Sequence, residues 1–377
     1  MVQTSFLLSI LFRMSCAFSA ERLLTPRLLF EQPSFGRKAK NALSHSRIFV
    51  KSHARNRALF GGIELEGKTL VSVQECLLAS QTKLETDETT KIVFVDGSWY
   101  HNGERNGRQE YEQGPRIKGA HYIDMDDLAC QFSLFPLLNP KNLPHMLPPA
   151  ILMAAAMDAM NIYNNDHIIV YGKDGCFFTP RTWFLFYAMG HNKDRVHLMQ
   201  GSLEEWMELG GSIETHFKNA LNVTQDLLPL KDQHQYKYQA HEATNTCDLQ
   251  FLLKSLNKEV ASPILLDARG SSFQRNGYIP GAIQIPYESL VEPSNSLKFK
   301  PSSELMKHFQ NAGVDVTNKN TIICTCGSGV SVCNLLVALR ECGRSLEADS
   351  YKTVMYDGSW IEWGADPNTP KVEGVGE

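Results

Sequence analysis

The sequence has 377 residues and a formal net charge of −4, with 43% apolar and 21% charged residues. This length suits two domains of about 150 residues or one large domain, and the apolar fraction is too high for a disordered chain. The small net charge gives no reason to expect nucleic-acid binding. No run of about 18 apolar residues follows the N-terminal region, and nine cysteines are too few for a disulfide-rich scaffold, so neither a membrane span nor a secreted disulfide framework is expected.

The first 60 residues differ from the rest of the chain in charge. They contain ten Lys and Arg but only two acids, Glu21 and Glu31, which makes this segment +8 and the remainder −12. An Arg-rich, Ser-containing and acid-poor N-terminus is typical of an organelle transit peptide. We therefore expect residues 1–62 to be a targeting presequence, with a mitochondrial destination.

Three alternatives remain open for this segment. Residues 6–12 are apolar apart from Ser9 and precede Ser15, Cys16 and Ala17, which is the arrangement of a secretory signal, although Arg13 interrupts it. A two-part signal and transit sequence would direct the protein to a plastid. A disordered basic tail without an address would leave it in the cytoplasm.

The first half of the remaining chain alternates strand and helix patterns. A β-branched run at residues 92–95 predicts a buried strand, a Gly-Ala pair leads into a second strand at 121–123, and residues 167–171 predict a third after a longer helical stretch. A glycine-containing loop then opens into a helix pattern. The half closes with Gly-Ser-Leu-Glu-Glu-Trp at residues 201–206.

The second half repeats this order. Residues 264–267, 283–285 and 321–325 predict the corresponding strands, and Gly-Ser-Trp-Ile-Glu-Trp at 358–363 closes it. The separation from the end of the third strand to the closing glycine is similar in the two halves, at 29 residues from Gly172 to Gly201 and 32 from Cys326 to Gly358. The sequence therefore predicts two copies of one domain.

Strands that alternate with helices predict an α/β fold, in which each domain is a mainly parallel sheet flanked by helices. We expect the first domain at residues 68–215, a polar linker at 216–245 and the second domain at 246–370.

The second domain carries a loop suited to a reactive thiol. The run Cys326-Gly327-Ser328-Gly329-Val330-Ser331 lies between a predicted strand and a predicted helix. Such a strand–loop–helix directs backbone N–H groups and a helix N-terminus into one small bowl that stabilises an anion. We expect Cys326 to have a lowered pKa there, and the bowl could equally hold the terminal sulfur of a persulfide.

Other interpretations of this loop are weaker. Cys326 could be a buried cysteine in a tight turn. A metal site made from Cys324, Cys326, Cys333 and Cys342 has a spacing that matches none of the usual zinc patterns. Cysteine phosphatases place an arginine at the sixth position after the cysteine, where this chain has Val332, so phosphatase activity is disfavoured.

These motifs carry a family resemblance. The tandem halves, the cysteine loop and the phrase Tyr-Asp-Gly-Ser-Trp-Ile-Glu-Trp at 356–363 resemble the two-domain sulfurtransferases of the rhodanese superfamily, and among them the 3-mercaptopyruvate and thiosulfate sulfurtransferases. Further matches are Asp-Gly-Ser-Trp-Tyr at 96–100, Pro-His-Met-Leu-Pro at 144–148 and Ile-Pro-Gly-Ala at 279–282. The resemblance extends over residues 68–368.

The resemblance implies a mechanism. Cys326 would attack the sulfur of a small donor, become a persulfide and pass that sulfur to thioredoxin, another thiol or cyanide. No metal or organic cofactor is implied, because the cysteine itself carries the sulfur.

Charge indicates which donor is used. Family members that prefer the thiosulfate dianion have two cationic residues directly after the cysteine, where this chain has Gly327 and Ser328. This favours 3-mercaptopyruvate, with thiosulfate as the alternative. By resemblance, Ser328 would be linked to His145 and Asp126 of the first domain in a proton relay, with Asp124 as the competing choice of carboxylate.

The part of the site that would bind the donor departs from the family. Where the family has two arginines that grip the carboxylate, Ser272 replaces the first and Arg275 is matched to the second. Arg269 matches an arginine that more often has a structural role. The expected substrate-binding residues are Gly327, Gly329, Val330, Ser331, Arg275 and Arg269.

The first domain is expected to be catalytically silent, because Gly172 stands where its bowl would need a thiol. Cys176 and Arg181 are expected to pack and close the cleft between the domains. The loop at residues 267–278, which bears these arginines in the family, is shorter in this chain. This leaves a second hypothesis open, that of a non-catalytic rhodanese-like binding module.

Overall fold

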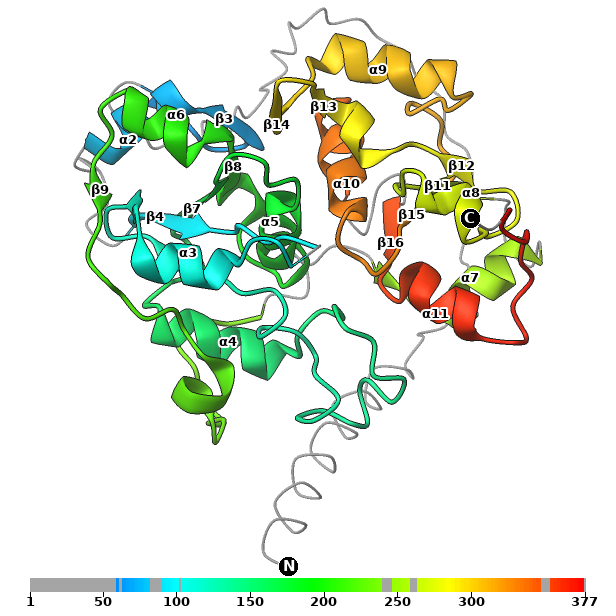
Figure 1. Ribbon diagram of the computed structural model, residues 1–377, viewed down its shortest axis with the longest axis horizontal. Coiled ribbons are helices and arrows are strands. Elements are labelled where there is room, and N and C mark those ends of the chain that lie inside the picture. Colours follow the sequence, from blue (N-terminus) through cyan, green and yellow to red (C-terminus); the bar gives the residue numbers. More distant parts are fainter. Residues whose placement is uncertain are drawn as a thin grey trace, which may run out of the picture. The chain divides into compact units, whose positions relative to one another are not determined.

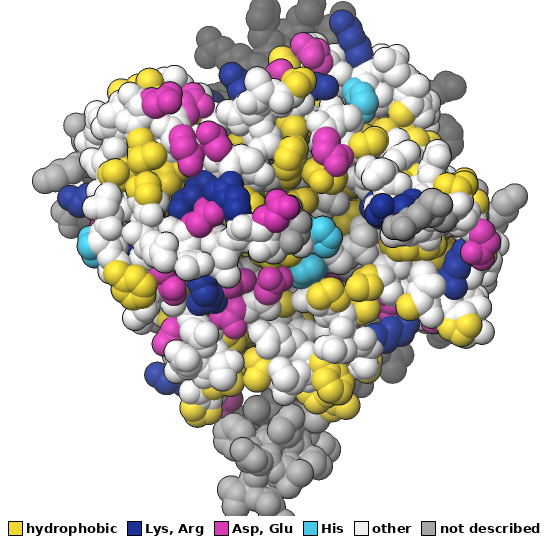
Figure 2. All heavy atoms as spheres, viewed as in Figure 1, with side chains coloured by type: hydrophobic (Ala, Val, Ile, Leu, Met, Phe, Trp, Pro, Cys, Tyr) yellow, Lys and Arg dark blue, Asp and Glu magenta, His cyan; other side chains and the backbone are white. Residues whose placement is uncertain are grey.

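A computed structural model of the chain describes residues 59–60, 63–81, 90–101, 103–238, 246–257, 263–346 and 353–375. Apart from residues 59–60, the expected presequence lies outside the described residues, and so do residues 239–245 of the expected linker. All described residues belong to one unit, Asn56–Glu377. On the face shown in Figure 2, basic and acidic side chains are interspersed.

The first sheet has five parallel strands in the order β3-β8-β7-β4-β6 (Figure 1). These strands are β3 (Leu70–Ser72), β4 (Ile92–Asp96), β6 (His121–Tyr122), β7 (His167–Gly172) and β8 (Val196–Ser202). The helices of this half are α2 (Val73–Gln81), α3 (Gly107–Gln113), α4 (Ala150–Ala159), α5 (Thr179–Ala188) and α6 (Leu203–Glu208).

The second sheet is also parallel, in the order β10-β16-β15-β11-β12. Its strands are β10 (Thr246–Cys247), β11 (Ile264–Asp267), β12 (Ile283–Gln284), β15 (Ile322–Thr325) and β16 (Thr353–Tyr356). Its helices are α7 (Leu249–Leu256), α8 (Ser272–Arg275), α9 (Ser302–Asn311), α10 (Val332–Glu341) and α11 (Ser359–Ala365). When strands are counted along the chain, both sheets have the order first, fifth, fourth, second, third, so the internal repeat and the α/β fold are confirmed.

Short elements complete the described chain. The antiparallel pairs are β1 (Leu59–Phe60) with β2 (Ile63–Glu64), β5 (Arg116–Ile117) with β9 (Ile213–Glu214), and β13 (Val291–Glu292) with β14 (Asn295–Phe299). The 3-10 turns are η1 (Lys193–Arg195) and η3 (Tyr287–Leu290), and η2 (Val223–Leu227) is a π-helical turn.

Both faces of each sheet are buried. In β4, Val93 and Val95 belong to one hydrophobic cluster, whereas Phe94 between them belongs to another. In β15, Ile322 and Ile323 divide in the same way. Successive side chains of a strand point to opposite faces, so a continuous apolar run is the sequence that a sheet covered on both sides requires.

Helices α5 and α10, one from each half, pack against each other. All ten residues of α5 are buried, and the helix packs against β7 and β8 of its own sheet and against α10 of the other half. One hydrophobic cluster therefore contains residues of both sheets, including Val170 and Leu198 from the first and Leu266 and Cys324 from the second.

The described part of the expected linker lies against the first half. Val223, Leu227 and Tyr236 are buried, and the Asp158 carboxylate of α4 accepts hydrogen bonds from the backbone N–H groups of Gln235 and Tyr236 at 3.0 and 2.9 Å. Burial of these apolar side chains explains why a largely polar stretch is held in place here.

Candidate active site

The loop at residues 326–331 joins β15 to α10, and its shape depends on a glycine. Gly329 has a φ of +85°, and a Cβ at this position would lie 2.9 Å from the carbonyl oxygen of Asp357. The loop is also tied to α11, because the N–H groups of Trp360 and Ile361 donate to the carbonyls of Cys326 and Gly327 at 3.0 and 2.8 Å. These contacts fix the backbone around the cysteine.

Ser359 lies beside Cys326 and was not identified from the sequence. Its hydroxyl oxygen accepts a hydrogen bond from the Cys326 N–H at 3.4 Å and lies 4.0 Å from the cysteine sulfur. The hydroxyl donates to the carbonyl of Tyr356 at 3.0 Å, so it can only accept from the thiol. In the sequence, only the Gly-Ser-Trp motif at 358–360 marks this serine, and the motif by itself does not reveal the contact with Cys326.

Cys326 faces a small cavity made by both halves of the molecule. The cysteine is 1% exposed and lines a volume of about 220 Å³. Trp99, His101 and Phe178 come from the first half, and the remaining lining residues come from the second: Arg269, Gly270, Ser271, Ser272, Tyr287, Glu288, Gly327, Ser328, Val330 and Ser331. A volume of this size admits a small molecule, so the site is one for a compact substrate.

The structure brings Ser328, His145 and Asp126 together. The Ser328 hydroxyl lies 2.9 Å from His145 Nδ1, and His145 Nε2 lies 3.0 Å from a carboxylate oxygen of Asp126. A neutral imidazole that donates from Nε2 to Asp126 accepts at Nδ1 from the serine hydroxyl. Protons can therefore move along this chain of three groups.

The Asp126 carboxylate is held in its charged form. Partial burial opposes its ionisation, but the hydrogen bonds from His145 and from Trp99 Nε1, the latter at 2.7 Å, prevail and lower the pKa of this carboxyl below its ordinary value. The competing residue Asp124 is occupied elsewhere, because its carboxylate pairs with Arg108 Nε at 2.9 Å and accepts the N–H of Asp126.

The two arginines expected to contact the donor differ in position. Arg269 lines the cavity and is 4% exposed, but the fully buried Asp267 accepts hydrogen bonds from its Nε and Nη2, the latter at 2.7 Å. Its guanidinium also lies 4.7 Å from the Trp360 ring centre. Its charge is therefore compensated within the protein.

Arg275 lies outside the lining of the cavity that contains Cys326, so its contact with the donor stays a prediction. Arg275 is the last residue of the short helix α8, its side chain is exposed, and it does not line the cavity with Cys326. The cavity is instead lined by Ser271 and Ser272 from this segment. Among the other expected residues, Gly327, Val330 and Ser331 line the cavity, whereas Gly329 serves the turn.

Most described cysteines other than Cys326 are buried, whereas Cys247 and Cys342 are partly exposed. Cys176 is fully buried, and burial raises the pKa of its thiol. The same cause raises the pKa of Cys333 to about 12 and also raises that of Cys324. Among the described residues, no three His, Cys, Asp or Glu side chains are arranged to hold a metal ion.

The equivalent position in the first half has no room for a side chain. Tyr171 pairs with Asp96 as Thr325 pairs with Asp267, so Gly172 corresponds to Cys326. A Cβ on Gly172 would lie 2.5 Å from the Thr179 methyl carbon and 3.2 Å from the Leu297 side chain.

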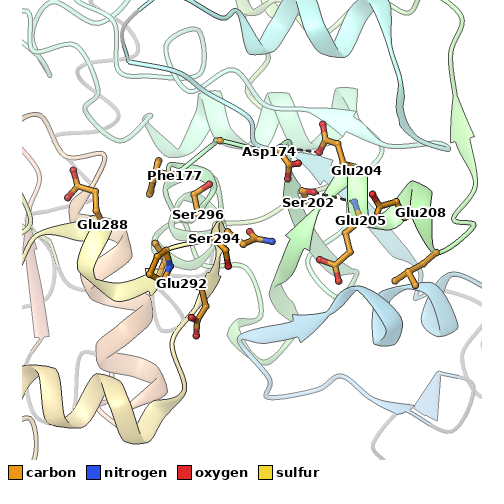
Figure 3. Close-up of a pocket in the computed structure, with 15 residues that line it drawn as sticks. Asp174, Phe177, Ser202, Glu204, Glu205, Glu208, Glu288, Glu292, Ser294 and Ser296 are labelled. Atoms are coloured by element: carbon orange, nitrogen blue, oxygen red, sulfur yellow. Dashed lines mark hydrogen bonds between the residues drawn. The ribbon is translucent and has the colours of Figure 1, made fainter.

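A larger acidic cavity adjoins the site. It encloses about 840 Å³ and carries the carboxylates labelled in Figure 3, with Glu204, Glu205 and Glu208 on the α6 side and Glu288 and Glu292 on the other. Glu288 lines this cavity and the smaller one that contains Cys326. Glu288 therefore adds a negative charge near the Cys326 thiol, whereas residues 327–331 of the loop have uncharged side chains.

The comparisons with known proteins agree with this geometry. The model of the Rhodanese-like domain family matches residues 105–209 and 248–366. Thiosulfate/3-mercaptopyruvate sulfurtransferase 1, mitochondrial, of Arabidopsis thaliana is 28% identical over 97% of this chain and 98% of that protein. 3-Mercaptopyruvate sulfurtransferase of Escherichia coli (strain K12) is 31% identical over 74% of this chain and 92% of that protein.

Solved structures share the fold. SseA from Escherichia coli, described in terms of the rhodanese fold and the catalytic mechanism of 3-mercaptopyruvate sulfotransferases, superposes with a TM-score of 0.58 at 25% identity, over 78% of this chain and 99% of that one. Tum1 from Saccharomyces cerevisiae gives a TM-score of 0.62 at 22% identity, over 82% of this chain and 99% of that one. The matched domains cover more than half of the sequence, and the chain belongs to the rhodanese family.

Proposed function

We propose that this protein is a sulfurtransferase that carries sulfur on Cys326 as a persulfide. The observation that supports this most directly is the position of the cysteine, in a cavity of about 220 Å³ beside the Ser328–His145–Asp126 chain. The names of the relatives agree with the reaction class. The catalytic unit comprises the two expected domains, 68–215 and 246–370.

The first step is written for 3-mercaptopyruvate. The Cys326 thiolate attacks the donor sulfur, a sulfur–sulfur bond forms, and the carbon–sulfur bond breaks with its electron pair passing to carbon. The leaving group is the enolate of pyruvate, which takes up one proton to give pyruvate. Ser328 can donate a hydrogen bond to the developing enolate oxygen, and His145 can supply or receive the proton through that hydroxyl.

In the second step a thiol collects the sulfur. Its thiolate attacks the outer sulfur of the persulfide, the Cys326 thiolate leaves, and the acceptor becomes a persulfide. With a dithiol acceptor such as thioredoxin, the second thiol then displaces hydrogen sulfide and the acceptor is left as a disulfide. Cyanide would leave as thiocyanate.

The charges in the cavity favour 3-mercaptopyruvate over thiosulfate. Gly327 and Ser328 are uncharged, Arg269 is neutralised by Asp267, and Glu288 adds a carboxylate. A dianion is therefore less favourable in this cavity than a monocarboxylate. Transfer from thiosulfate is the alternative activity.

We test the function by mass spectrometry after incubation with 3-mercaptopyruvate and, separately, with thiosulfate. The expected results below are for 3-mercaptopyruvate. We expect the peptide that contains Cys326 to gain the mass of one sulfur atom while an equal amount of pyruvate is released. Cys326→Ser should abolish turnover, and the matched variant Cys176→Ser, which removes an equally buried thiol, should retain it. If neither donor adds sulfur to Cys326, the protein is a non-catalytic rhodanese-like module.

We further propose a mitochondrial location. The +8 charge of residues 1–60 and the mitochondrial relative from Arabidopsis thaliana support it. No helix among the described residues is long and apolar enough to cross a membrane. A fluorescent reporter fused to residues 1–62 should enter mitochondria, and entry into plastids or retention in the cytoplasm would contradict this.

A further inference from the structure

Arg181 reaches from the first half of the molecule into the second. It lies in the first turn of α5 and is 4% exposed. Its Nη1 donates to the carbonyl of Gly329 at 3.0 Å, and its Nη2 donates to the carbonyl of His145. One guanidinium therefore binds the main chain on both sides of the boundary between the halves.

One carbonyl belongs to His145, a member of the proton relay, and the other belongs to Gly329, which is next to Ser328 in the chain. Gly329 directly follows Ser328, and His145 is the residue whose ring bonds that serine at 2.9 Å. Asp357 strengthens the same junction, because its carboxylate lies 3.4 Å from Arg181 Nη1 and accepts the Leu147 N–H at 2.9 Å. The buried ion pair of Arg181 and Asp357 thus binds the main chain on both sides of the Ser328–His145 hydrogen bond.

Arginine is suited to this place for a geometric reason. Its planar guanidinium has five donors in a fixed arrangement, so it can bind two carbonyls and a carboxylate at once, whereas an ammonium is a point charge on a flexible stem. A displacement of about 1 Å between reacting groups can reduce a catalytic rate by about 100-fold. Loss of the Arg181 contacts would leave Ser328 and His145 free to move apart.

We propose that Arg181 is a positioning residue that maintains the Ser328–His145 hydrogen bond between the two halves. The inference rests on the proposed function, because it gives that bond a part in the reaction. Arg181 does not line the cavity that contains Cys326. It binds the carbonyls of His145 and Gly329 and acts through these two residues.

The test combines Arg181→Met and Arg181→Lys with His145→Gln. We expect Arg181→Met to lower kcat for 3-mercaptopyruvate by about 100-fold with KM changed by less than about 3-fold, and Arg181→Lys to recover part of the loss. In the His145→Gln background, Arg181→Met should cost less than about 3-fold more, because the bond it maintains is already absent. The pH profile of kcat for Arg181→Met should resemble that of His145→Gln.

Arg116 provides the matched control. It is fully buried and donates to the carbonyls of Tyr111 and His216, which both precede the second domain. Arg116→Lys should lower the thermal stability and leave kcat and the pH profile unchanged. An equal loss of kcat in that variant would mean that any buried arginine has this effect, and the proposal would be wrong.

Two other results would overturn the proposal. The first is a double variant whose fold-loss of kcat equals the product of the losses in Arg181→Met and His145→Gln. The second is an unchanged kcat in folded Arg181→Lys and Arg181→Met. If Arg181→Met does not fold, Arg181→Lys takes its place in the double variant. Cys326→Ser is measured in parallel, since turnover by that variant would refute the proposed function, whereas its inactivity together with either of these results would refute only the role of Arg181.

Discussion

At the scale of single residues, the side chains that line the cavity with Cys326 carry no excess of positive charge. Asp267 accepts hydrogen bonds from both Nε and Nη2 of Arg269, so the only guanidinium among the described cavity-lining residues has a partner. Glu288 lines the same cavity and adds a negative charge. Under the proposed function, each additional negative charge on a donor should weaken its binding, so we expect the cavity to discriminate against a dianion.

Replacement of Glu288 by glutamine should shift donor preference toward thiosulfate. Removal of one carboxylate at a distance of several ångströms changes the energy of a nearby charge by about 1 kcal/mol, and a dianion benefits twice as much as a monoanion. We expect kcat/KM for thiosulfate to rise about 5-fold more than kcat/KM for 3-mercaptopyruvate, measured by thiocyanate and pyruvate formation.

Glu292→Gln is the control for this prediction. Glu292 lines the larger acidic cavity but not the one that contains Cys326, so its replacement changes the net charge equally and should leave the ratio of the two kcat/KM values unchanged. Equal shifts in the two variants would show that the effect comes from the overall charge and not from the cavity.

At the scale of elements, the sequence predicted three of the five strands of each sheet, missed β3, β8, β10 and β16, and predicted few of the loop contacts. Continuous apolar runs at 92–95, 264–266 and 322–324 were sufficient to locate β4, β11 and β15, because the middle of a strand covered on both faces is apolar on both. The turn at Gly329 followed from the glycine-rich run. The contact of Ser359 with Cys326 did not, because it depends on how α11 packs against a loop 33 residues away in sequence.

The Gly329→Ala variant tests how strictly the loop is built. A methyl group there would lie 2.9 Å from a backbone oxygen in addition to requiring a φ of +85°. Gly343 has nearly the same φ, +83°, and open space at its Cβ position, so Gly343→Ala measures the cost of the conformation alone. We expect Gly343→Ala to lower the free energy of unfolding by about 1 kcal/mol and Gly329→Ala by about 3 kcal/mol, in urea titrations.

Turnover separates the two glycine variants further. Gly329→Ala must displace either Asp357 or the backbone next to Ser328, so we expect it to lose at least about 100-fold in kcat. Gly343→Ala should retain its rate at temperatures where it is folded. Normal turnover in Gly329→Ala would show that the loop tolerates a shifted backbone.

At the scale of the whole molecule, the site exists only because two halves meet. His145 and Ser328 are 183 positions apart, and no local pattern encodes their 2.9 Å hydrogen bond. The resemblance to a family was needed to pair them, and it also favoured Asp126 over Asp124. The contact that the resemblance implies for Arg275 stays a prediction, because this side chain at the end of α8 is exposed and does not line the cavity with Cys326.

The first sheet should make the molecule sensitive to acid. His167 of β7 and His197 of β8 lie with Nδ1 and Nε2 2.9 Å apart, and Nδ1 of His197 lies 2.6 Å from the Lys68 carbonyl. Burial lowers the pKa of His167 to about 2 and those of His197 and His191 to about 4. These rings are therefore neutral in the folded protein at pH values where exposed histidines are charged.

The sign of the effect follows from proton binding. An unfolded histidine takes up a proton below about pH 6.5, whereas each of these folded ones remains neutral until about pH 4 or lower, so stability is lost as the pH falls through this range. Each histidine contributes a slope of up to about 1.4 kcal/mol per pH unit. In urea titrations from about pH 7.5 to about pH 4.5, His167→Gln should reduce the slope by about one histidine's share, whereas the exposed control His216→Gln should leave it unchanged. A slope that His167→Gln does not alter would mean that the histidine pair takes up protons without unfolding the sheet.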